Sequence, residues 1–430
     1  MVSDGLPHLP VDWKTFTAPA RGQSYTDIIS GCKVTRLTDS PADAIPETHN
    51  YSTQSPMNSN DTLILIGDMN GYTMLVDPSG NVVVSKATSA SKIQRNDSEF
   101  VWDATNPNVF YYANNNSLMM GTVSGNTVTV STFYTFPEYA GHVVNIMGAP
   151  DLSQDGDHLP LIGQNVSGGH EDVFIFQLST KTKSPVYTTT CTGDANGSNN
   201  ACLHKLITTP RNGVIIQFAA SGTGAEQGQH LWEAPWTRPL PLVNDGGSHL
   251  DTGLDMNGNE VAIQEGSSSG QPDACPAHGG SDMNTLPSMA LSCLVDKNYL
   301  AIHVSYRGNA SQPWVIISGQ GQGHGPEWFD NDTKYSAPYI GSISDGSGWK
   351  SYQNEIIAVR IDAANNLSKI IRLGHSYSRA NESYESQPQA SISRDGKYVI
   401  FNSNMAYAHA GCPANDDPPH CSDVYLMKIQ

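Results

Sequence analysis

Short runs of alternating apolar and polar residues recur along the chain, and each follows a turn signal. Asn-Gly and Asp-Gly between such runs are strong β-hairpin signals, because the favoured two-residue turns need positive φ. Three copies are clear: Asn212-Gly213 before Val214–Phe218, Asn257-Gly258 before Glu260–Ile263, and Asp395-Gly396 before Tyr398–Phe401. Each copy predicts one β-hairpin.

Less regular copies of this pattern, a turn followed by an apolar strand, occur along most of the remaining chain. They lie at Ser55–Asp61, Trp102–Tyr112, Leu152–Ile162 and Val295–Val304, so most of the seven hairpins are 40 to 57 residues apart. Second hairpins follow within several units, for example Ser117–Val123 with Thr127–Phe133. A period of about 40 to 50 residues with four strands per unit is typical of a β-propeller blade. We therefore predict an all-β fold, a single seven-bladed β-propeller. Six blades are the alternative, because the long segments 266–284 and 319–349 interrupt units five and six.

The two ends of the chain suggest how such a ring closes. Residues 1–31 contain three prolines and little periodicity, which indicates an extended N-terminal arm, and residues 32–430 form the propeller. Val34–Thr38 predicts a strand, and Asp423–Ile429 predicts another that no partner follows. Pairing the N-terminal strand with the C-terminal blade removes two exposed edges. We expect this closure.

Charge and hydropathy exclude several kinds of partner. The formal net charge of -18 repels polyanions, so we expect no nucleic acid partner and no binding to anionic membranes. No run of 18 apolar residues occurs, so we expect no membrane insertion.

The cysteines bear on location. Cys191 with Cys202, Cys275 with Cys293 and Cys412 with Cys421 form three pairs in loop-like sequence, which favours disulfide staples over unrelated free thiols. Cys32 is left over, and we expect it to be a buried thiol. The chain opens without a signal peptide. We expect a secreted, extracellular monomer whose leader has been removed.

Several polar side chains precede the expected innermost strands. These are His49, His142, His204, His249 and Gln387. If the phrases are rotated copies, these side chains converge on one axis, where imidazoles suit a divalent metal or acid-base chemistry. We predict a metal (manganese, zinc or calcium) held by His204, His249 and Gln387, and substrate contacts from His49, His142 and Trp328. The alternative is that each histidine caps a loop or packs between blades.

Three of these motifs together resemble a known family. They are His204 with Pro210-Arg211-Asn212-Gly213, Ser248-His249 with Asn257-Gly258, and Gln387-Pro388-Gln389 with Arg394-Asp395-Gly396. Over about residues 200 to 405 the chain resembles propeller-type polysaccharide lyases of the oligogalacturonate lyase kind. The resemblance implies a seven-bladed ring and a divalent metal held by histidines and a glutamine. The chain departs from the family pattern at Gln387-Pro388-Gln389, where the family has His-Pro-His.

The resemblance also implies a reaction, β-elimination across a uronic acid in a polysaccharide or oligosaccharide. His204 or His249 would be the base, Arg211 or Arg307 would neutralise the carboxylate, and Tyr306 or Tyr51 would protonate the leaving oxygen. Arg307 beside Gly308 is alternatively a turn residue, and Tyr306 a core residue. The net negative charge opposes the approach of a polyuronate.

A second hypothesis is a non-catalytic propeller that binds a glycan or a protein through exposed aromatic side chains. The candidates are Trp232, Trp236, Trp314, Trp328, Phe329, Trp349, Tyr377, Tyr384 and Tyr407.

Overall fold

The structure, a computed structural model, describes a large part of the chain. The described residues are 6, 8–12, 15–43, 47–49, 51–68, 73–86, 99–148, 150–164, 170–192, 203–218, 226, 228–236, 242–244, 250–255, 257–258, 260–264, 288–290, 303–306, 314–318, 355–363, 366–378, 388–405 and 422–429.

The fold is all-β, as predicted. Within the described residues, the complete helical elements are the short α1 (Ser40–Asp43) and η1 (Pro137–Tyr139); Lys86 and Met405 also have helical backbone, and the other regular elements are strands. No helix in this part of the chain is long and apolar enough to cross a membrane.

The described strands form seven sheets, which we number in chain order of their first inner strand. Sheet 1 contains β3 (Glu47–Thr48), β4 (Ile64–Asp68), β5 (Thr73–Val76) and β6 (Val82–Val84). Sheet 2 contains β7 (Val101–Trp102), β8 (Val109–Asn114), β9 (Ser117–Ser124) and β10 (Thr127–Thr135). Sheet 3 contains β11 (Val144–Asn145), β12 (His158–Gln164), β13 (His170–Gln177), β14 (Thr182–Lys183) and β15 (Tyr187–Thr192).

The later sheets follow the same plan. Sheet 4 contains β16 (Leu203–Thr208), β17 (Val214–Phe218), β18 (Gln229–Trp232) and β19 (Leu242–Asn244). Sheet 5 contains β20 (Leu250–Leu254), β21 (Glu260–Gln264) and β22 (Ser288–Ala290). Sheet 6 contains β23 (His303–Tyr306), β24 (Trp314–Ser318), β25 (Glu355–Ala363) and β26 (Asn366–His375). Sheet 7 contains β27 (Ser391–Ile392), β28 (Tyr398–Ser403), β29 (Asp423–Lys428), β2 (Lys33–Arg36) and β1 (Ser24–Thr26).

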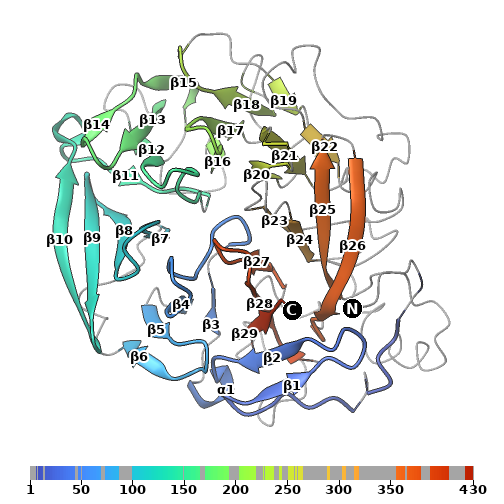
Figure 1. Ribbon diagram of the computed structural model, residues 1–430. Helices are drawn as coiled ribbons and strands as arrows, with labels where there is room; N and C mark the ends of the chain where they lie inside the picture. The colour runs from blue at the N-terminus through green and yellow to red at the C-terminus, as the bar shows by residue number, and fades with distance from the viewer. Residues whose placement is uncertain are drawn as a thin grey trace.

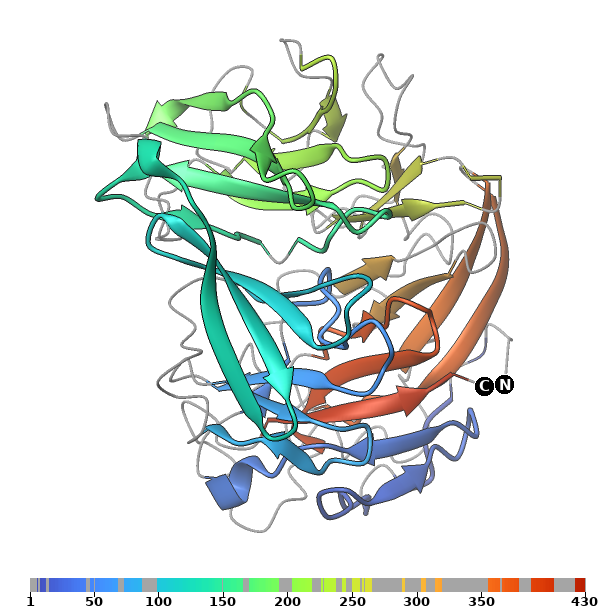
Figure 2. The same ribbon diagram turned by 60° about the vertical axis from the view of Figure 1, so that its left-hand side comes forward.

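The sheets lie around a common centre, with β3, β7, β11, β16, β20, β23 and β27 innermost (Figure 1). Figure 2 shows the long β9–β10 hairpin along the outside of the molecule. Apolar clusters lie between neighbouring sheets: one joins sheets 1 and 2, and others join sheets 2 and 3, 3 and 4, 4 and 5, and 6 and 7. A further cluster packs Ile400 and Val424 of sheet 7 against Ile64 and Met74 of sheet 1. Both faces of most sheets are therefore buried, which explains continuous apolar strands such as β8.

The predicted pairing of the N-terminal strand with the C-terminal strand is present. β2 pairs antiparallel with β29, placing Val34 opposite Met427 and Arg36 opposite Tyr425. β1, within the segment expected to be an extended arm, pairs in turn with β2. Sheet 7 thus combines strands from the two ends of the chain.

The hairpins predicted from Asn-Gly and Asp-Gly are present, but their turns differ from the two-residue type. In sheet 7, Gly396 has φ of 77° and donates its N–H to Ser393 O at 3.0 Å, while Ser393 N–H bonds to Tyr398 O at 2.8 Å. Sheet 3 repeats this arrangement with Ser153 and Gly156. In each of these turns one residue has a left-handed backbone conformation. The loop is longer than two residues, so a single positive φ is enough to match the twist of the two strands.

Sheet 5 departs from the expected four antiparallel strands. β22 pairs with β21 in the parallel direction, with Ala262 opposite Ser288. A parallel neighbour needs a long connection, and the chain between Gln264 and Ser288 supplies one. The hairpin expected at Val295–Val304 lies almost entirely outside the described residues.

The predicted disulfides involve residues that the structure does not describe: each pair has at least one member outside the described part of the chain. Cys32 is a buried free thiol, as predicted. Burial raises the pKa of the Cys32 thiol, so it is not an activated nucleophile.

Candidate functional site at the centre of the ring

The inner strands give the ring two ends, which we call the strand-start end and the turn end. At the turn end, Asn212 Nδ2 of sheet 4 donates a hydrogen bond to Asp155 Oδ2 of sheet 3 at 3.0 Å. Arg394 reaches from sheet 7 and donates to Ser153 O at 2.8 Å. The hairpin turns of sheets 3, 4 and 7 therefore meet at one end. The first residues of their inner strands must lie towards the other.

The middle of the ring is packed with polypeptide. The chain after β3 crosses the centre: Gln54 Nε2 donates to Pro150 O at 2.9 Å, and Thr53 Oγ1 approaches Gly148 O at 3.5 Å. From the other side, Ser391 Oγ donates to Gln54 O at 2.9 Å. The segment after β3 thus contacts the inner segments of sheets 3 and 7 directly.

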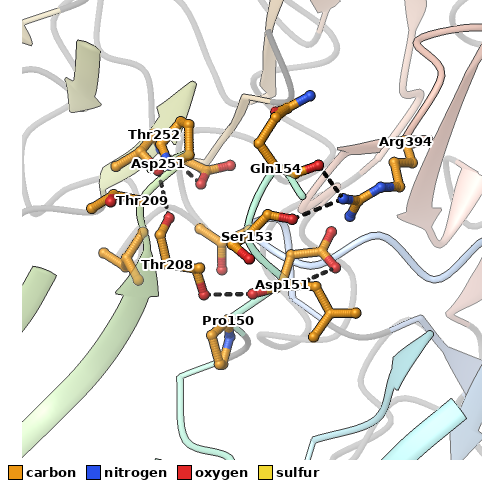
Figure 3. A pocket seen from close by; sticks show the side chains of 13 residues that line it. Pro150, Asp151, Ser153, Gln154, Thr208, Thr209, Asp251, Thr252 and Arg394 are labelled. Carbon is orange, nitrogen blue, oxygen red and sulfur yellow. Dashed lines mark hydrogen bonds between the residues drawn. The ribbon is translucent and has the colours of Figure 1, made fainter. Parts of the chain in front are cut away.

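A small polar pocket lies at the turn end (Figure 3). Its volume is about 40 Å³, which is enough for a few water molecules and far too small for a sugar ring. The lining residues come from five sheets: Thr53, Pro150, Asp151, Leu152, Ser153, Gln154, Ile207, Thr208, Thr209, Pro210, Asp251, Thr252 and Arg394.

Hydrogen bonds brace the walls of this pocket. Thr252 Oγ1 donates to Thr208 O at 2.6 Å, and Thr208 Oγ1 donates to Asp151 O at 2.5 Å (Figure 3). These bonds join sheets 5, 4 and 3 in series. The turn end is therefore a structural junction, and the candidate functional site is the strand-start end.

His204 lies at the strand-start end with its side chain exposed. The pairing of β16 with β17 shifts register between Leu203 and Lys205, so His204 lies in a β-bulge. Bulges redirect side chains out of the regular alternation and are common next to active sites. The local structure thus presents the imidazole to solvent while Leu203 and Leu206 on either side remain buried.

Lys205, the next residue, is a cation that our sequence analysis missed. Its side chain is only 8% exposed, and its Nζ lies 3.8 Å from the centroid of the Tyr51 ring, a cation–π contact between sheets 4 and 1. The available signal was a single lysine within the largely apolar strand Leu203–Thr208. The structure thus places a positive charge beside His204.

The other two predicted site histidines that the structure describes, His49 and His142, lie near the starts of inner segments. His49 follows β3 and is 2% exposed, with its backbone N–H donating to Asn402 Oδ1 at 3.2 Å. His142 precedes β11 and is half-buried, with its backbone N–H bonded to Tyr139 O at 2.9 Å. The substrate contacts expected of His49 and His142 stay predictions.

Arg211 is not brought to His204. It lies at the turn end, where its Nη2 donates to Gly258 O at 2.9 Å and its backbone N–H donates to Glu260 Oε1 at 2.7 Å. A strand rises about 3.3 Å per residue, so even Thr208 is about 13 Å from His204 along β16. Arg211 therefore joins sheets 4 and 5, and burial raises the pKa of its partner Glu260.

Several predicted site residues fall outside the described residues, namely His249, Arg307, Trp328 and Gln387. Tyr306 is the last residue of β23, opposite Val315 of β24. Within the described part of the chain, no group of three or more His, Cys, Asp or Glu side chains could hold a metal ion. The ligand set His204, His249 and Gln387 stays a prediction.

Two aromatic residues suggested as exposed sugar contacts are buried instead. Trp232 is 2% exposed and Tyr377 is 1% exposed. Trp232 packs edge-on against Trp236 at 4.8 Å between ring centroids, and Tyr377 stacks on Phe16 at 3.9 Å. Neither Trp232 nor Tyr377 can stack on a glycan without unpacking the core.

Comparison with solved structures connects this architecture to a group of enzymes. An oligogalacturonate lyase from Vibrio parahaemolyticus matches with a TM-score of 0.53 and 11% sequence identity, over 95% of this chain and 96% of that chain. An oligogalacturonate lyase in complex with manganese matches with a TM-score of 0.52 and 14% identity, over the same shares. No family model matches, and no curated protein matches. The resemblance predicted for about residues 200 to 405 is confirmed at the level of fold and extends along nearly the whole chain.

Proposed function

We propose that the protein is a propeller-type polysaccharide lyase that cleaves a uronate-containing glycan at the strand-start end of the ring. The observation that carries the proposal is the fold shared with two oligogalacturonate lyases over 95% of the chain. The exposed imidazole of His204 beside the cation of Lys205 supports it. In this proposal each of the seven sheets is one blade, and the pairing of β2 with β29 closes the ring.

The chemistry assigned to this end is β-elimination. A base removes the proton on C5 of the uronic acid, and the C–H electron pair becomes the C4–C5 double bond. The C4–O bond then breaks, and the leaving oxygen takes a proton from an acid. His204 is the base in this proposal, because its imidazole is exposed and imidazole is a common general base. Tyr306 or Tyr51 would be the acid; the Tyr51 ring lies against Lys205 Nζ, and its hydroxyl is buried in this structure.

A divalent metal held by His204, His249 and Gln387 is an alternative role for His204, because an imidazole bound to a metal cannot also accept the C5 proton; another group would then be the base. Imidazole nitrogen and amide oxygen are suitable ligands for manganese, and His204 presents an exposed ring. The metal would polarise the uronate carboxylate and so acidify C5. Extracellular location and the three disulfide staples complete the proposal, and mass spectrometry of unreduced peptides tests the staples.

The test is an assay of the whole protein on oligomers of galacturonate, glucuronate and guluronate, following the ultraviolet absorbance of the unsaturated product. We expect product from at least one glycan and a loss of about 100-fold or more in kcat with His204→Gln, the range for removing a general base. His158→Gln is the matched control, since His158 lies in the turn-end hairpin of sheet 3 beside Asp155. Absence of product from every uronate, with or without added manganese, rejects the lyase and favours the glycan- or protein-binding alternative.

A further inference from the structure

Lys205 is buried to a degree that is rare for lysine. Only 8% of it is exposed, although an ammonium group loses hydration energy when it leaves water. Arg394 and Arg211 lie at the turn end, where they donate to backbone carbonyls. Lys205 therefore supplies positive charge at the end of the ring where His204 is exposed.

The surroundings of Lys205 hold its stem in one place. Gly148 of sheet 3 has φ of +82°, and a Cβ at this position would lie 2.7 Å from both Cα and Cβ of Lys205. Only glycine fits so close an approach, so the backbone of sheet 3 lies directly against the lysine. At the end of the side chain, Nζ lies 3.8 Å from the centroid of the Tyr51 ring. Three sheets together fix the position of the ammonium group.

We propose that Lys205 binds the carboxylate of the uronic acid residue whose C5 proton is removed, an inference that rests on the proposed lyase function. An ammonium group beside the carboxylate withdraws charge as the C5 anion forms, which favours proton loss to His204, the neighbouring residue on β16. The molecule carries a net charge of -18, so a uronate needs such a local cation to bind. Lys205 supplies selectivity for the free acid over a neutral ester.

The proposal is tested with Lys205→Met, Lys205→Arg and the matched control Lys33→Met, whose lysine is exposed on β2. The probes are trisaccharides of galacturonate, glucuronate and guluronate, each as the free acid and as the methyl ester, with affinities from calorimetry. We expect Lys205→Met to weaken binding of the preferred free acid by about 10-fold or more, the scale of a lost charge-assisted hydrogen bond. The affinity for the ester should stay within about twofold, and Lys205→Arg should retain most of the preference for the acid.

The outcomes separate the two proposals. An unchanged ratio of acid to ester affinity in Lys205→Met overturns the role of Lys205, while product formation by the wild type leaves the lyase intact. Equal weakening of acid and ester also overturns it, because a purely structural lysine would act on both. If Lys205→Met does not fold, Lys205→Gln takes its place, because it also removes the charge: a lower ratio of acid to ester affinity at a native melting temperature supports recognition of the carboxylate by the lysine ammonium, and a ratio equal to that of Lys33→Met rejects it. No binding of any uronate by the wild type, together with no product, removes the lyase proposal itself.

Discussion

Two carboxyl groups face each other where the hairpin turns of sheets 1 and 7 meet. Burial, the hydrogen bond to Asp395 and the charge of Asp395 raise the pKa of Asp61 to about 7. Lys397 forms an ion pair with Asp395, whose own pKa is lowered. The two carboxyls therefore share a proton below about pH 7.

This pair predicts a dependence of stability on pH. Because the folded pKa of Asp61 lies above its unfolded value of about 4, the stabilisation is complete below pH 4 and is lost as the pH rises through 7. Asp61→Asn keeps a donor to Asp395, does not titrate and suits the φ of 59°. At pH 8 we expect the free energy of unfolding of the variant to exceed that of the wild type by about 1 kcal/mol, a value that allows for solvent screening at this turn. Urea unfolding between pH 5 and 8 measures it.

The contrasting variant is Asp155→Asn. Burial would raise the pKa of Asp155, but hydrogen bonds from Ser153 and from the backbone of Asp157 lower it. This carboxylate stabilises the fold above about pH 4, so its amide variant should be less stable at pH 8. Equal effects of both substitutions would contradict the shared proton.

At the scale of elements, a buried cluster holds the N-terminal arm against β26. His375 Nδ1 lies 3.1 Å from Asp27 Oδ2, and its Nε2 lies 2.9 Å from His8 O. Since both partners are acceptors, both ring nitrogens carry protons and the imidazole is a cation. Glu355 lies 3.8 Å from His375 and also pairs with Arg372.

The cluster predicts that docking of the arm depends on His375. Burial lowers the pKa of His375, but the hydrogen bond and charge of Asp27 outweigh burial and raise it. The contribution of His375 is full below about pH 6.5 and is lost as the pH rises through the higher folded pKa. For Asp27 burial raises the pKa, yet the His375 bond brings it to about 2, so its contribution is lost only towards that pH. His375→Gln should cost about 3 kcal/mol, the scale for breaking a buried ion pair.

Hydrogen exchange of β1 amides, in wild type and variant between pH 5 and 9, measures this docking. Wild-type exchange should accelerate above neutral pH beyond the intrinsic rate, and His375→Gln should remove that excess. Phe16→Leu is the control, because it weakens the stacking on Tyr377 without touching the charges. It should speed exchange at every pH alike. Identical pH profiles for wild type and His375→Gln would show that the aromatic contacts alone hold the arm.

Local signals in the sequence predicted the strands and hairpins. They could not predict contacts between residues far apart in the chain. Asp395-Gly396 and Asn212-Gly213 predict hairpins, because the conformation of a turn depends on only four or five neighbouring residues. His375 with Asp27 spans 348 positions, and no local pattern reports such a contact. Lys205 was missed for the same reason: its partners, Tyr51 and Gly148, come from other sheets. Trp232 was misjudged because every residue of β18 is buried, which a short strand containing Gln229 and His230 does not reveal.

At the scale of the whole molecule, one buried ion pair secures the joint between the two ends of the chain. Arg36 on β2 contacts Asp423 on β29 at 2.8 Å, with side-chain exposures of 6% and 0%. Asp423 Oδ1 also accepts bonds from Thr38 Oγ1 at 2.7 Å and Ser40 N–H at 2.8 Å. Apolar packing between sheets 7 and 1 surrounds the joint.

We predict that Asp423→Ala destabilises the whole ring, because it leaves Arg36 buried without its carboxylate. The expected loss is about 3 to 5 kcal/mol in the free energy of unfolding. Unfolding should remain a single transition when followed by urea denaturation with near- and far-ultraviolet circular dichroism. The double variant Arg36→Met with Asp423→Ala should recover part of the loss. A separate early transition confined to one region would contradict a cooperative ring.

The pairing of β2 with β29 also has a consequence for folding during translation. A ribosome delivers Lys33–Arg36 almost four hundred residues before Asp423–Lys428. Until β29 has been made, β2 has an unpaired edge that can form hydrogen bonds with other nascent chains. Newly made protein should therefore need shielding by a chaperone until Asp423–Lys428 has emerged, and translation stalled just upstream of Asp423 should leave a product prone to aggregation.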